Sequence, residues 1–289
     1  MRAASNKTIS ISVFQGEVRQ GDAASNLDKT LEQLTIAESR NIDILCMPES
    51  FLHGYYESKK DALINSIELD STAYLKMLER LKPFKKTTLL LGINEKSGND
   101  IFNTVVVIEN GKHIGQYRKA YTYSPYDYFS LGRDFPVFEK NGVRYGIIIC
   151  IDSVYLEPAH ILALKGAQIL FCPMFNKVEN NSKMLAYLNR KSHFIARAFE
   201  NECWFASSDI ILENNGTHVC PGSATILNKN GEVVCISEPF SEMLLQYDIP
   251  ISALRDDNWI HSHYRRLLGT NELRELANVE YIKRTNNLV

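Results

Sequence analysis

The segment from Ile9 to Met47 constrains the fold more than any other part of the sequence. Apolar residues alternate with serine over Ile9–Phe14, which predicts a half-buried strand. Leucines then recur at helical spacing after Asn26, the expected N-cap, and a continuous apolar run at 42–47 predicts a buried strand. A strand, a helix and a strand within about forty residues are typical of a βαβ unit with parallel strands.

The rest of the chain continues with strands and helices in mixed order. Hairpin signals at Asn110-Gly111 and at 228–231 indicate that some neighbouring strands are antiparallel. This mixture predicts an α/β (α+β) fold of two mixed sheets packed face to face, with helices outside. Strands are expected at 88–94, 103–109, 143–151, 168–173, 203–209, 224–228, 232–237 and 244–248, and helices at 71–81, 157–165 and 182–201.

The domain organisation is expected to be simple. The 289 residues are enough for one or two domains, but no Gly, Ser or Pro-rich linker, low-complexity segment or repeat divides them. We therefore expect a single domain over residues 1–255. The polar segment 256–289 has no strand pattern, so it either is disordered or packs on the domain or on a partner subunit.

Charge and composition exclude several classes of function. A net charge of -2 gives no electrostatic reason to bind nucleic acid or an anionic membrane, and the 45% hydrophobic content excludes disorder. No membrane helix or signal-peptide core is recognisable, so we expect a cytoplasmic protein with a small-molecule substrate. The six cysteines form no Cys-x-x-Cys pair, which argues against a zinc site or a disulfide framework, and five of them are interpreted as small buried residues.

Three loops each place a reactive side chain at the end of an apolar strand. They carry Glu49 after Pro48, Lys119 after Arg118, and Cys150 after an isoleucine run. Singly, each side chain is more readily explained by solvation or packing. Together they make an acyl-transfer site, because a mostly protonated thiol needs a base and a tetrahedral intermediate needs an oxyanion donor. Glu49 is the expected base, Cys150 the nucleophile, and Lys119 with the backbone N–H of Ile151 the oxyanion site.

The same segments resemble the three signatures of the carbon–nitrogen hydrolase family, also called the nitrilase superfamily. The matching stretches, in the family's order, are Pro48-Glu49-Ser-Phe-Leu-His-Gly54-Tyr55, Tyr117-Arg118-Lys119, and Cys150-Ile-Asp152 with Glu157-Pro158. The resemblance implies a four-layer αββα sandwich, association through helices into a homodimer or larger homo-oligomer, and no metal or organic cofactor. It also implies the three roles proposed above for Glu49, Lys119 and Cys150.

The resemblance further implies hydrolysis of a small linear amide or N-carbamoyl amine through a cysteine thioester. True nitrilases usually carry Trp-Glu where this chain has Ile151-Asp152, which favours an amidase or carbamoylase. The alternatives are acyl transfer to an amine, nitrile hydrolysis, and a non-catalytic binding protein. A papain-like Cys-His site is disfavoured because no histidine, including His53, lies in a recognisable partner motif.

Two departures from the family concern the substrate pocket. The second glutamate of many family amidases corresponds here to Pro125, with Tyr126 or Asp127 as candidate replacements. The usual asparagine near the end of a later strand corresponds to Ser208 or Asp209. The residues predicted for the pocket are Tyr55, Tyr126, Asp127 and Phe175. Arg118 is expected to be the structural partner of a carboxylate, and the Arg197/Glu200 pair a structural ion pair or a subunit contact.

Overall fold

The computed structural model describes residues 7–123, 128–179, 191–212, 218–256 and 259, within two compact units, Met1–Leu254 and Arg255–Val289. In the second unit, the Arg255 guanidinium lies over the Trp259 ring, 4.1 Å from its centroid. The assignment of residues 1–255 to one domain with a tail at 256–289 stays a prediction. No helix in the described ranges is long and apolar enough to cross a membrane.

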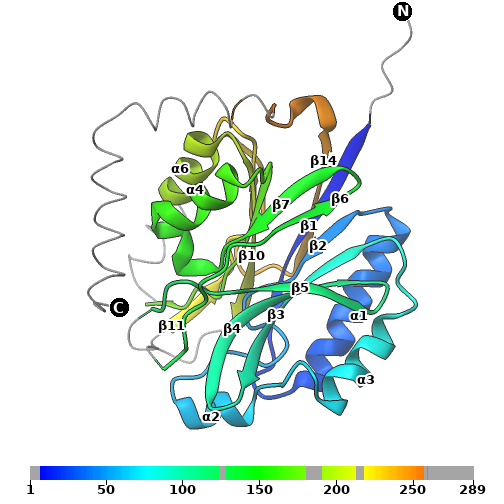
Figure 1. The fold of residues 1–289 in the computed structure, drawn as a ribbon, viewed down its shortest axis with the longest axis vertical. Coiled ribbons are helices and arrows are strands. Elements are labelled where there is room, and N and C mark those ends of the chain that lie inside the picture. The colour runs from blue at the N-terminus through cyan, green and yellow to red at the C-terminus, as the bar shows by residue number, and fades with distance from the viewer. Residues whose placement is uncertain (1–6, 124–127, 180–190, 213–217, 257–258, 260–289) are drawn as a thin grey trace, which may run out of the picture. The chain divides into compact units, whose positions relative to one another are not determined.

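The first unit is a mixed α/β fold built on one large curled sheet (Figure 1). Its elements, in chain order, are β1 (Thr8–Glu17), α1 (Ala23–Ser39), β2 (Ile44–Cys46), α2 (Lys59–Ile64), α3 (Thr72–Leu81), β3 (Thr88–Ser97), β4 (Asp100–Glu109), β5 (Lys112–Arg118), β6 (Val137–Lys140), β7 (Val143–Ile147), the 3-10 helix η1 (Cys150–Val154), α4 (Leu156–Leu164), β8 (Ile169–Pro173), β9 (Val178–Glu179), α6 (Ser192–Asn201), β10 (Trp204–Leu212), β11 (His218–Pro221), β12 (Thr225–Leu227), β13 (Val233–Ile236), β14 (Met243–Pro250) and the 3-10 helix η2 (Ile251–Ala253).

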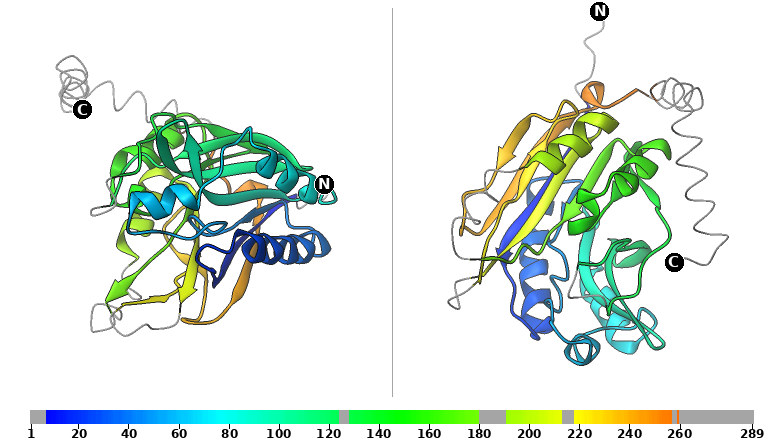
Figure 2. Two further views of the ribbon diagram at one scale, coloured as in Figure 1. Left: turned by 90° about the horizontal axis from the view of Figure 1, so that it is seen from below. Right: turned by 90° about the vertical axis from the view of Figure 1, so that its left-hand side faces the viewer.

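The sheet has two halves that meet at β1 and β10. Its main path runs β5-β4-β3-β2-β1-β10-β8-β7-β6. β1 and β2 are parallel, as the βαβ pattern predicts, whereas β3 and β4 are antiparallel. β1 and β10 pair only at their ends, where Gln15–Glu17 lies beside Asp209–Ile211. The two halves therefore separate away from this short seam, and both views of Figure 2 show the resulting curl.

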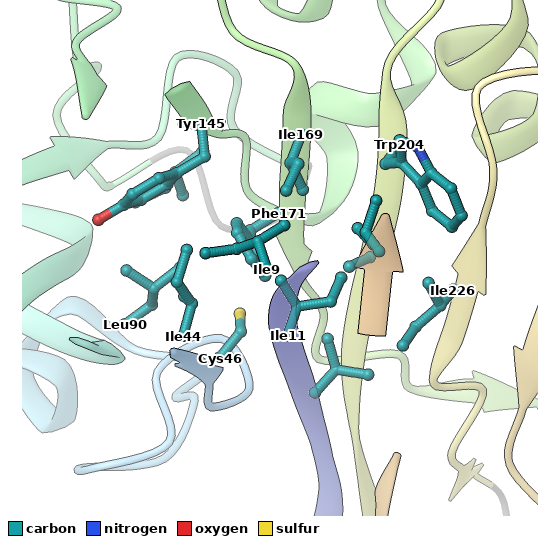
Figure 3. Close-up of a cluster of buried hydrophobic side chains, with 14 of the residues drawn as sticks. Ile9, Ile11, Ile44, Cys46, Leu90, Tyr145, Ile169, Phe171, Trp204 and Ile226 are labelled. Carbon is teal, nitrogen blue, oxygen red and sulfur yellow. The ribbon is translucent and has the colours of Figure 1, made fainter. Parts of the chain in front are cut away.

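Alternating side chains on the strands build two apolar layers. On β3, Leu89, Leu91 and Ile93 pack in a cluster with Leu34 of α1 and Met77 of α3, whereas Leu90 points into another cluster. That second cluster joins the two halves of the sheet, because Ile9 and Ile44 lie there with Phe171 and Trp204 (Figure 3).

Helices cover the two halves of the sheet on opposite sides, with α1 and α3 on one side and α4 and α6 on the other (Figure 1). α4 packs on β7 so closely that a Cβ at Gly146 would lie 2.9 Å from Leu162. α6 packs on β10, where the Phe194 and Phe205 rings stack with centroids 4.9 Å apart.

Some predicted boundaries are wrong, each for a local reason. α1 is capped by the Asp22 side chain, which accepts from the Ser25 N–H; Asn26 is buried instead and bonds to Arg19 and Leu52. β7 ends at Ile147 rather than at residue 151, because the chain must turn into η1 at Cys150. The last residues of the helix predicted at 182–201 form α6, and residues 182–190 lie outside the described ranges.

Candidate active site

The three predicted catalytic residues follow three different strands and converge. Glu49 follows β2, Lys119 follows β5, and Cys150 begins η1 after β7. The Lys119 Nζ lies 2.5 Å from Glu49 Oε1, and both side chains are buried, 5% and 1% exposed. The charges of Glu49 and Lys119 both act on the pKa of the Cys150 thiol, Glu49 raising it and Lys119 lowering it.

The two carboxylate oxygens of Glu49 have different surroundings. Oε1 accepts from Lys119 Nζ and from the Asn103 amide, whose Nδ2 lies 2.7 Å away. Oε2 is buried and has no hydrogen-bond partner among the described residues. One oxygen is therefore fixed by two donors, and the other keeps its lone pairs available for an incoming proton.

The loop that carries Glu49 is held between two strands. The Glu49 N–H donates to the Met174 carbonyl (3.3 Å), and the Leu52 N–H donates to the Gly92 carbonyl (3.0 Å). At Gly92 on β3, a Cβ would lie 2.2 Å from the Pro48 carbonyl oxygen. This close approach requires glycine, so β3 sets the position of the Glu49 loop.

Lys119 is attached to the strand that carries Asn103. Its backbone N–H donates to the Asn103 carbonyl (2.9 Å), and its own carbonyl accepts from the Gly132 N–H (2.8 Å). Burial alone would lower the pKa of Lys119, but the Glu49 charge and smaller contributions outweigh burial and raise it. The side chain is therefore a cation at neutral pH, as oxyanion stabilisation requires.

Cys150 occupies a strained turn at the end of a buried run. Its φ is 48°, in the left-handed region that non-glycine residues seldom adopt, and such strain is common at active sites. Burial raises the pKa of the thiol and the Glu49 charge raises it further, against the Lys119 charge and a hydrogen bond from the Phe175 N–H. The resting group is thus a thiol, which needs a base in order to attack.

Asp152 ties the lysine segment to the cysteine turn. This fully buried carboxylate accepts from the Tyr117 hydroxyl (2.8 Å), the Ile149 N–H (2.9 Å) and the Tyr121 N–H (2.9 Å). Burial raises its pKa to about 6, although the Lys119 charge and these hydrogen bonds oppose the rise. Asp152 therefore fixes residues on both sides of Lys119 relative to Cys150.

A group of aromatic rings lies beside Lys119. The Tyr55 ring lies 5.9 Å from Lys119 Nζ, and its centroid lies 5.4 Å from that of Phe175 and 5.7 Å from that of Phe129. Burial raises the pKa of Tyr55, and the Lys119 charge opposes this. Tyr55 thus lies beside Lys119 and Phe175 packs on Tyr55, while their role in a substrate pocket stays a prediction.

The other predicted residues have different outcomes. Ile151 lies in the first turn of η1, where backbone N–H groups have no partner within the helix. Tyr126 and Asp127, together with Pro125, lie outside the described residues. Asn103 and Asp152 are site residues to which the sequence gives no predicted role; the position of Asp152 two residues after Cys150 is the one signal for either.

Two predicted ion pairs are confirmed as structural contacts. Arg118 turns away from the site and binds buried Glu95 with two nitrogens, Nε at 2.9 Å and Nη2 at 2.5 Å. Arg197 binds Glu200 on α6 and also donates from Nε to the Ser153 carbonyl (3.0 Å). These arginines therefore support the backbone next to Lys119 and Cys150.

Known proteins resemble the chain in sequence and in fold. It is similar to the 2-oxoglutaramate amidase of Bacillus subtilis, with 27% identity over 231 residues, 78% of this chain and 84% of that protein. Its fold matches an amidase from Nesterenkonia sp. with a TM-score of 0.71 at 20% identity, covering 91% of this chain and 99% of the other.

A longer solved structure also matches. A glutamine-dependent NAD+ synthetase from Acinetobacter baumannii gives a TM-score of 0.74 at 20% identity, covering 86% of this chain and 47% of the synthetase. This chain therefore spans less than half of that protein. The model of the carbon-nitrogen hydrolase family matches residues 10–258, most of the chain. On this match, the chain belongs to the carbon-nitrogen hydrolase family.

Proposed function

We propose that the protein hydrolyses a non-peptide carbon–nitrogen bond of a small linear amide or N-carbamoyl amine through a thioester on Cys150. The observation that carries the proposal is the difference between the surroundings of the two Glu49 carboxylate oxygens. Oε1 accepts from Lys119 and Asn103, and Oε2 is buried without a hydrogen-bond partner among the described residues. A general base needs a lone pair that no other donor occupies, beside the proton that it takes.

In the first half of the reaction, Glu49 Oε2 takes the thiol proton as the Cys150 sulfur bonds to the substrate carbonyl carbon. The carbonyl oxygen becomes an oxyanion beside the Lys119 ammonium and the Ile151 N–H. Glu49 then gives the proton to the leaving nitrogen, the carbon–nitrogen bond breaks, and ammonia or an amine departs. The acyl group remains on sulfur as a thioester.

In the second half, water hydrolyses the thioester. Glu49 Oε2 takes a proton from water while the water oxygen attacks the thioester carbon. The carbon–sulfur bond breaks, the acid is released, and the sulfur recovers its proton from Glu49. No redox change occurs, so these steps need only the residues of the site and water.

The similarity to an enzyme named 2-oxoglutaramate amidase supports an amide substrate. The rings of Tyr55, Phe129 and Phe175 favour an acyl group with an apolar portion. We also propose that the layers around the curled sheet form a four-layer αββα sandwich, and that the protein is a homodimer.

The proposed function is tested by measuring ammonia or amine release across amides, N-carbamoyl amines and nitriles. The wild type should turn over at least one amide or carbamoyl compound and show the mass of an acyl adduct. Cys150→Ala should reduce the rate to background, because the nucleophile is lost. Cys203→Ala is the matched control, since Cys203 is a buried thiol directly before β10 that donates to the Ala167 carbonyl (3.2 Å) and that no step of the mechanism uses.

The result that would overturn the proposal is equally direct. Release of ammonia by Cys150→Ala at the wild-type rate would exclude the thioester. A wild type with neither turnover nor adduct across the panel would instead favour a binding protein. If a competing amine captured the acyl group in place of water, the product mass would indicate a transferase.

A further inference from the structure

Two buried oxygen atoms of the catalytic site lack a hydrogen-bond partner. Among the described residues, the buried side-chain nitrogen and oxygen atoms without one are Glu49 Oε2 and Asn103 Oδ1, which we call the acceptor pair. Both residues are 1% exposed. Buried polar groups in folded proteins nearly always have a partner, so an exception calls for a reason such as a bound water or a catalytic role. The two exceptions belong to directly bonded side chains, because Asn103 Nδ2 donates to Glu49 Oε1 (2.7 Å).

The hydrogen bonds around Glu49 fix which way the Asn103 amide points. Glu49 Oε1 accepts from both Lys119 Nζ and Asn103 Nδ2. The opposite orientation of the amide would place its oxygen against the carboxylate oxygen, and neither atom has a hydrogen to donate. The Asn103 backbone is held as well, because its carbonyl accepts from the Lys119 N–H (2.9 Å). Asn103 Oδ1 is therefore a stationary acceptor on a group bonded to the carboxylate.

The chemistry of the acceptor pair selects a small, neutral donor with two hydrogens. Asn103 Oδ1 and Glu49 Oε2 are the remaining terminal atoms of the amide and the carboxylate that the hydrogen bond joins. A cation is disfavoured there, because the Lys119 ammonium already lies 2.5 Å from Glu49 Oε1. Water donates two hydrogen bonds and fits a buried site that offers it polar partners.

We propose that Asn103 Oδ1 and Glu49 Oε2 together hold the water that hydrolyses the Cys150 thioester. Oε2 takes one hydrogen of the water as the water oxygen bonds to the thioester carbon and the carbon–sulfur bond breaks. Oδ1 accepts the other hydrogen, which stays on that oxygen and leaves with the acid, and Glu49 returns its proton to the sulfur. This inference rests on the proposed function for the thioester, and it assigns to Asn103 a contact with the attacking water.

An alcohol tests the second acceptor, because its hydroxyl group has one hydrogen where water has two. Methanol that donates to Glu49 Oε2 would turn its methyl group toward Asn103 Oδ1 and leave this oxygen without a donor. A site built to bind a hydrogen of one molecule rejects the analogue that lacks this hydrogen. Glu49 acts in the same way on either nucleophile, so the ratio of ester to acid among the products reports on the second acceptor.

The experiment acylates Cys150 with isotopically labelled p-nitrophenyl acetate in mixtures of methanol and water, and NMR at early times separates acetic acid from methyl acetate. Per mole of each nucleophile, the wild type should form less ester than acid by roughly tenfold or more. In Asn103→Leu, which lacks the acceptor, this preference for water should fall roughly tenfold, the effect of about one hydrogen bond. Asn103→Val, with a β-branched side chain that suits a strand, is the second variant and should change the ratio in the same direction.

Thr104→Val is the matched control. It removes a buried hydrogen bond (2.8 Å) to Glu95 from the neighbouring position of β4, so it perturbs the same strand and leaves the acceptor pair intact. Its ratio of ester to acid should equal that of the wild type. Cys150→Ala measures the background reaction in solution, and thermal melting shows which variants are folded.

Two results would overturn the water site. One is a wild type that captures methanol as readily as water, mole for mole, and the other is a folded Asn103→Leu or Asn103→Val that keeps the wild-type ratio. The activated ester separates this proposal from the proposed function, because it can acylate Cys150 whether or not amides are substrates. A wild type that turns over the ester but no amide or carbamoyl compound would refute the proposed function, and its ratio would still decide the water site. A wild type that the ester does not acylate would refute both.

Discussion

At the scale of single residues, the protein distinguishes the two oxygens of one carboxylate. Asn103 donates to Glu49 Oε1 from β4, and its own Oδ1 is buried without a partner among the described residues. Such an amide costs stability, since a buried acceptor is left unsatisfied. In the mechanism that we propose, it fixes the rotation of the Glu49 carboxylate, so that Oε2 is the oxygen presented to the reaction.

We therefore predict that Asn103→Leu, similar in size but without the donor, lowers kcat roughly tenfold, which corresponds to the loss of one hydrogen bond to a charged group. KM should change little, because Asn103 is assigned no substrate contact. Steady-state kinetics with the best amide of the panel measures both. Thr104→Val is the control: it removes a buried hydrogen bond (2.8 Å) to Glu95 from the next position of β4. Equal losses of kcat in the two variants would contradict the assignment.

Asp152 gives a prediction about pH. Burial raises its pKa from 3.8 to about 6, so between these values the folded protein holds a proton that the unfolded chain has released. Stability from this group is thus fully present below about pH 4 and is lost as the pH rises through 6. A difference of about two pKa units corresponds to about 3 kcal/mol.

Urea unfolding of the wild type and Asp152→Asn tests this sign. Because asparagine does not titrate, the stability of the wild type relative to the variant should decrease between pH 4 and pH 7. The decrease should be up to about 3 kcal/mol. A relative stability that rises over the same range would show that the hydrogen bonds from Tyr117, Ile149 and Tyr121 outweigh burial.

The sequence predicts some site residues far better than others. Glu49, Lys119 and Cys150 are recognisable because each follows an apolar strand in a loop with a distinctive motif. Asn103 is a polar residue inside a buried strand, and its partner Glu49 is far away in the chain. The pairing of β4 with β3 and β5 brings Asn103 to the site, and strand pairing is not visible in local periodicity.

At the scale of elements, a strand fixes the position of a loop where a glycine allows the two backbones to approach closely. β3 passes against the Glu49 loop at Gly92, where an added Cβ would also lie 2.6 Å from the Ser50 backbone nitrogen. These are backbone atoms, which cannot move aside as a flexible side chain does. The loop would have to shift, and Glu49 would move with it.

We predict that Gly92→Ala lowers kcat at least a hundredfold, because misplacing a catalytic group by about an ångström is enough for such a loss. It should also lower the melting temperature. Gly98→Ala on the turn after β3 is the control: its φ is +60°, so it carries backbone strain, but no atom lies within 4 Å of the added Cβ. Normal activity in Gly92→Ala would contradict the role assigned to β3.

Among the elements, regular patterns are predicted well and short ones are missed. α3 begins after Ser71 as expected, with the Ser71 hydroxyl accepting from the Tyr74 N–H. The hairpin at Asn110-Gly111 has both residues at positive φ, as its sequence predicts. α2, β6 and β11 were not predicted, because four to six residues are too few to show a periodicity and tertiary contacts stabilise them.

At the scale of the whole molecule, several exposed apolar side chains of the first unit lie on neighbouring helices. η1, α4 and α6 are in mutual contact, and they carry exposed apolar residues. Phe199 on α6 is 66% exposed, and Val154 on η1 is 51% exposed. A patch of this kind is typical of an interface, and we assign it to a second copy of the chain.

Analytical ultracentrifugation should therefore show the wild type at twice its 32.9 kDa mass. Phe199→Glu should shift the protein toward the monomer by placing charge in the interface. Ile64→Glu is the control, since Ile64 is 69% exposed but lies on α2. A wild type that is monomeric at tens of micromolar would refute this assignment.

The short seam between β1 and β10 has a consequence for how the protein can be divided. Glu49 and Lys119 follow β2 and β5 in one half of the sheet, and Cys150 follows β7 in the other. A cut anywhere between Lys119 and Cys150 would leave the ion pair on one fragment and the thiol on the other. In the proposed mechanism, catalysis would then return only when the fragments reassociate across the apolar layer, the seam and the long antiparallel pairing of β1 with β14, so turnover would serve as a complementation signal for correct assembly.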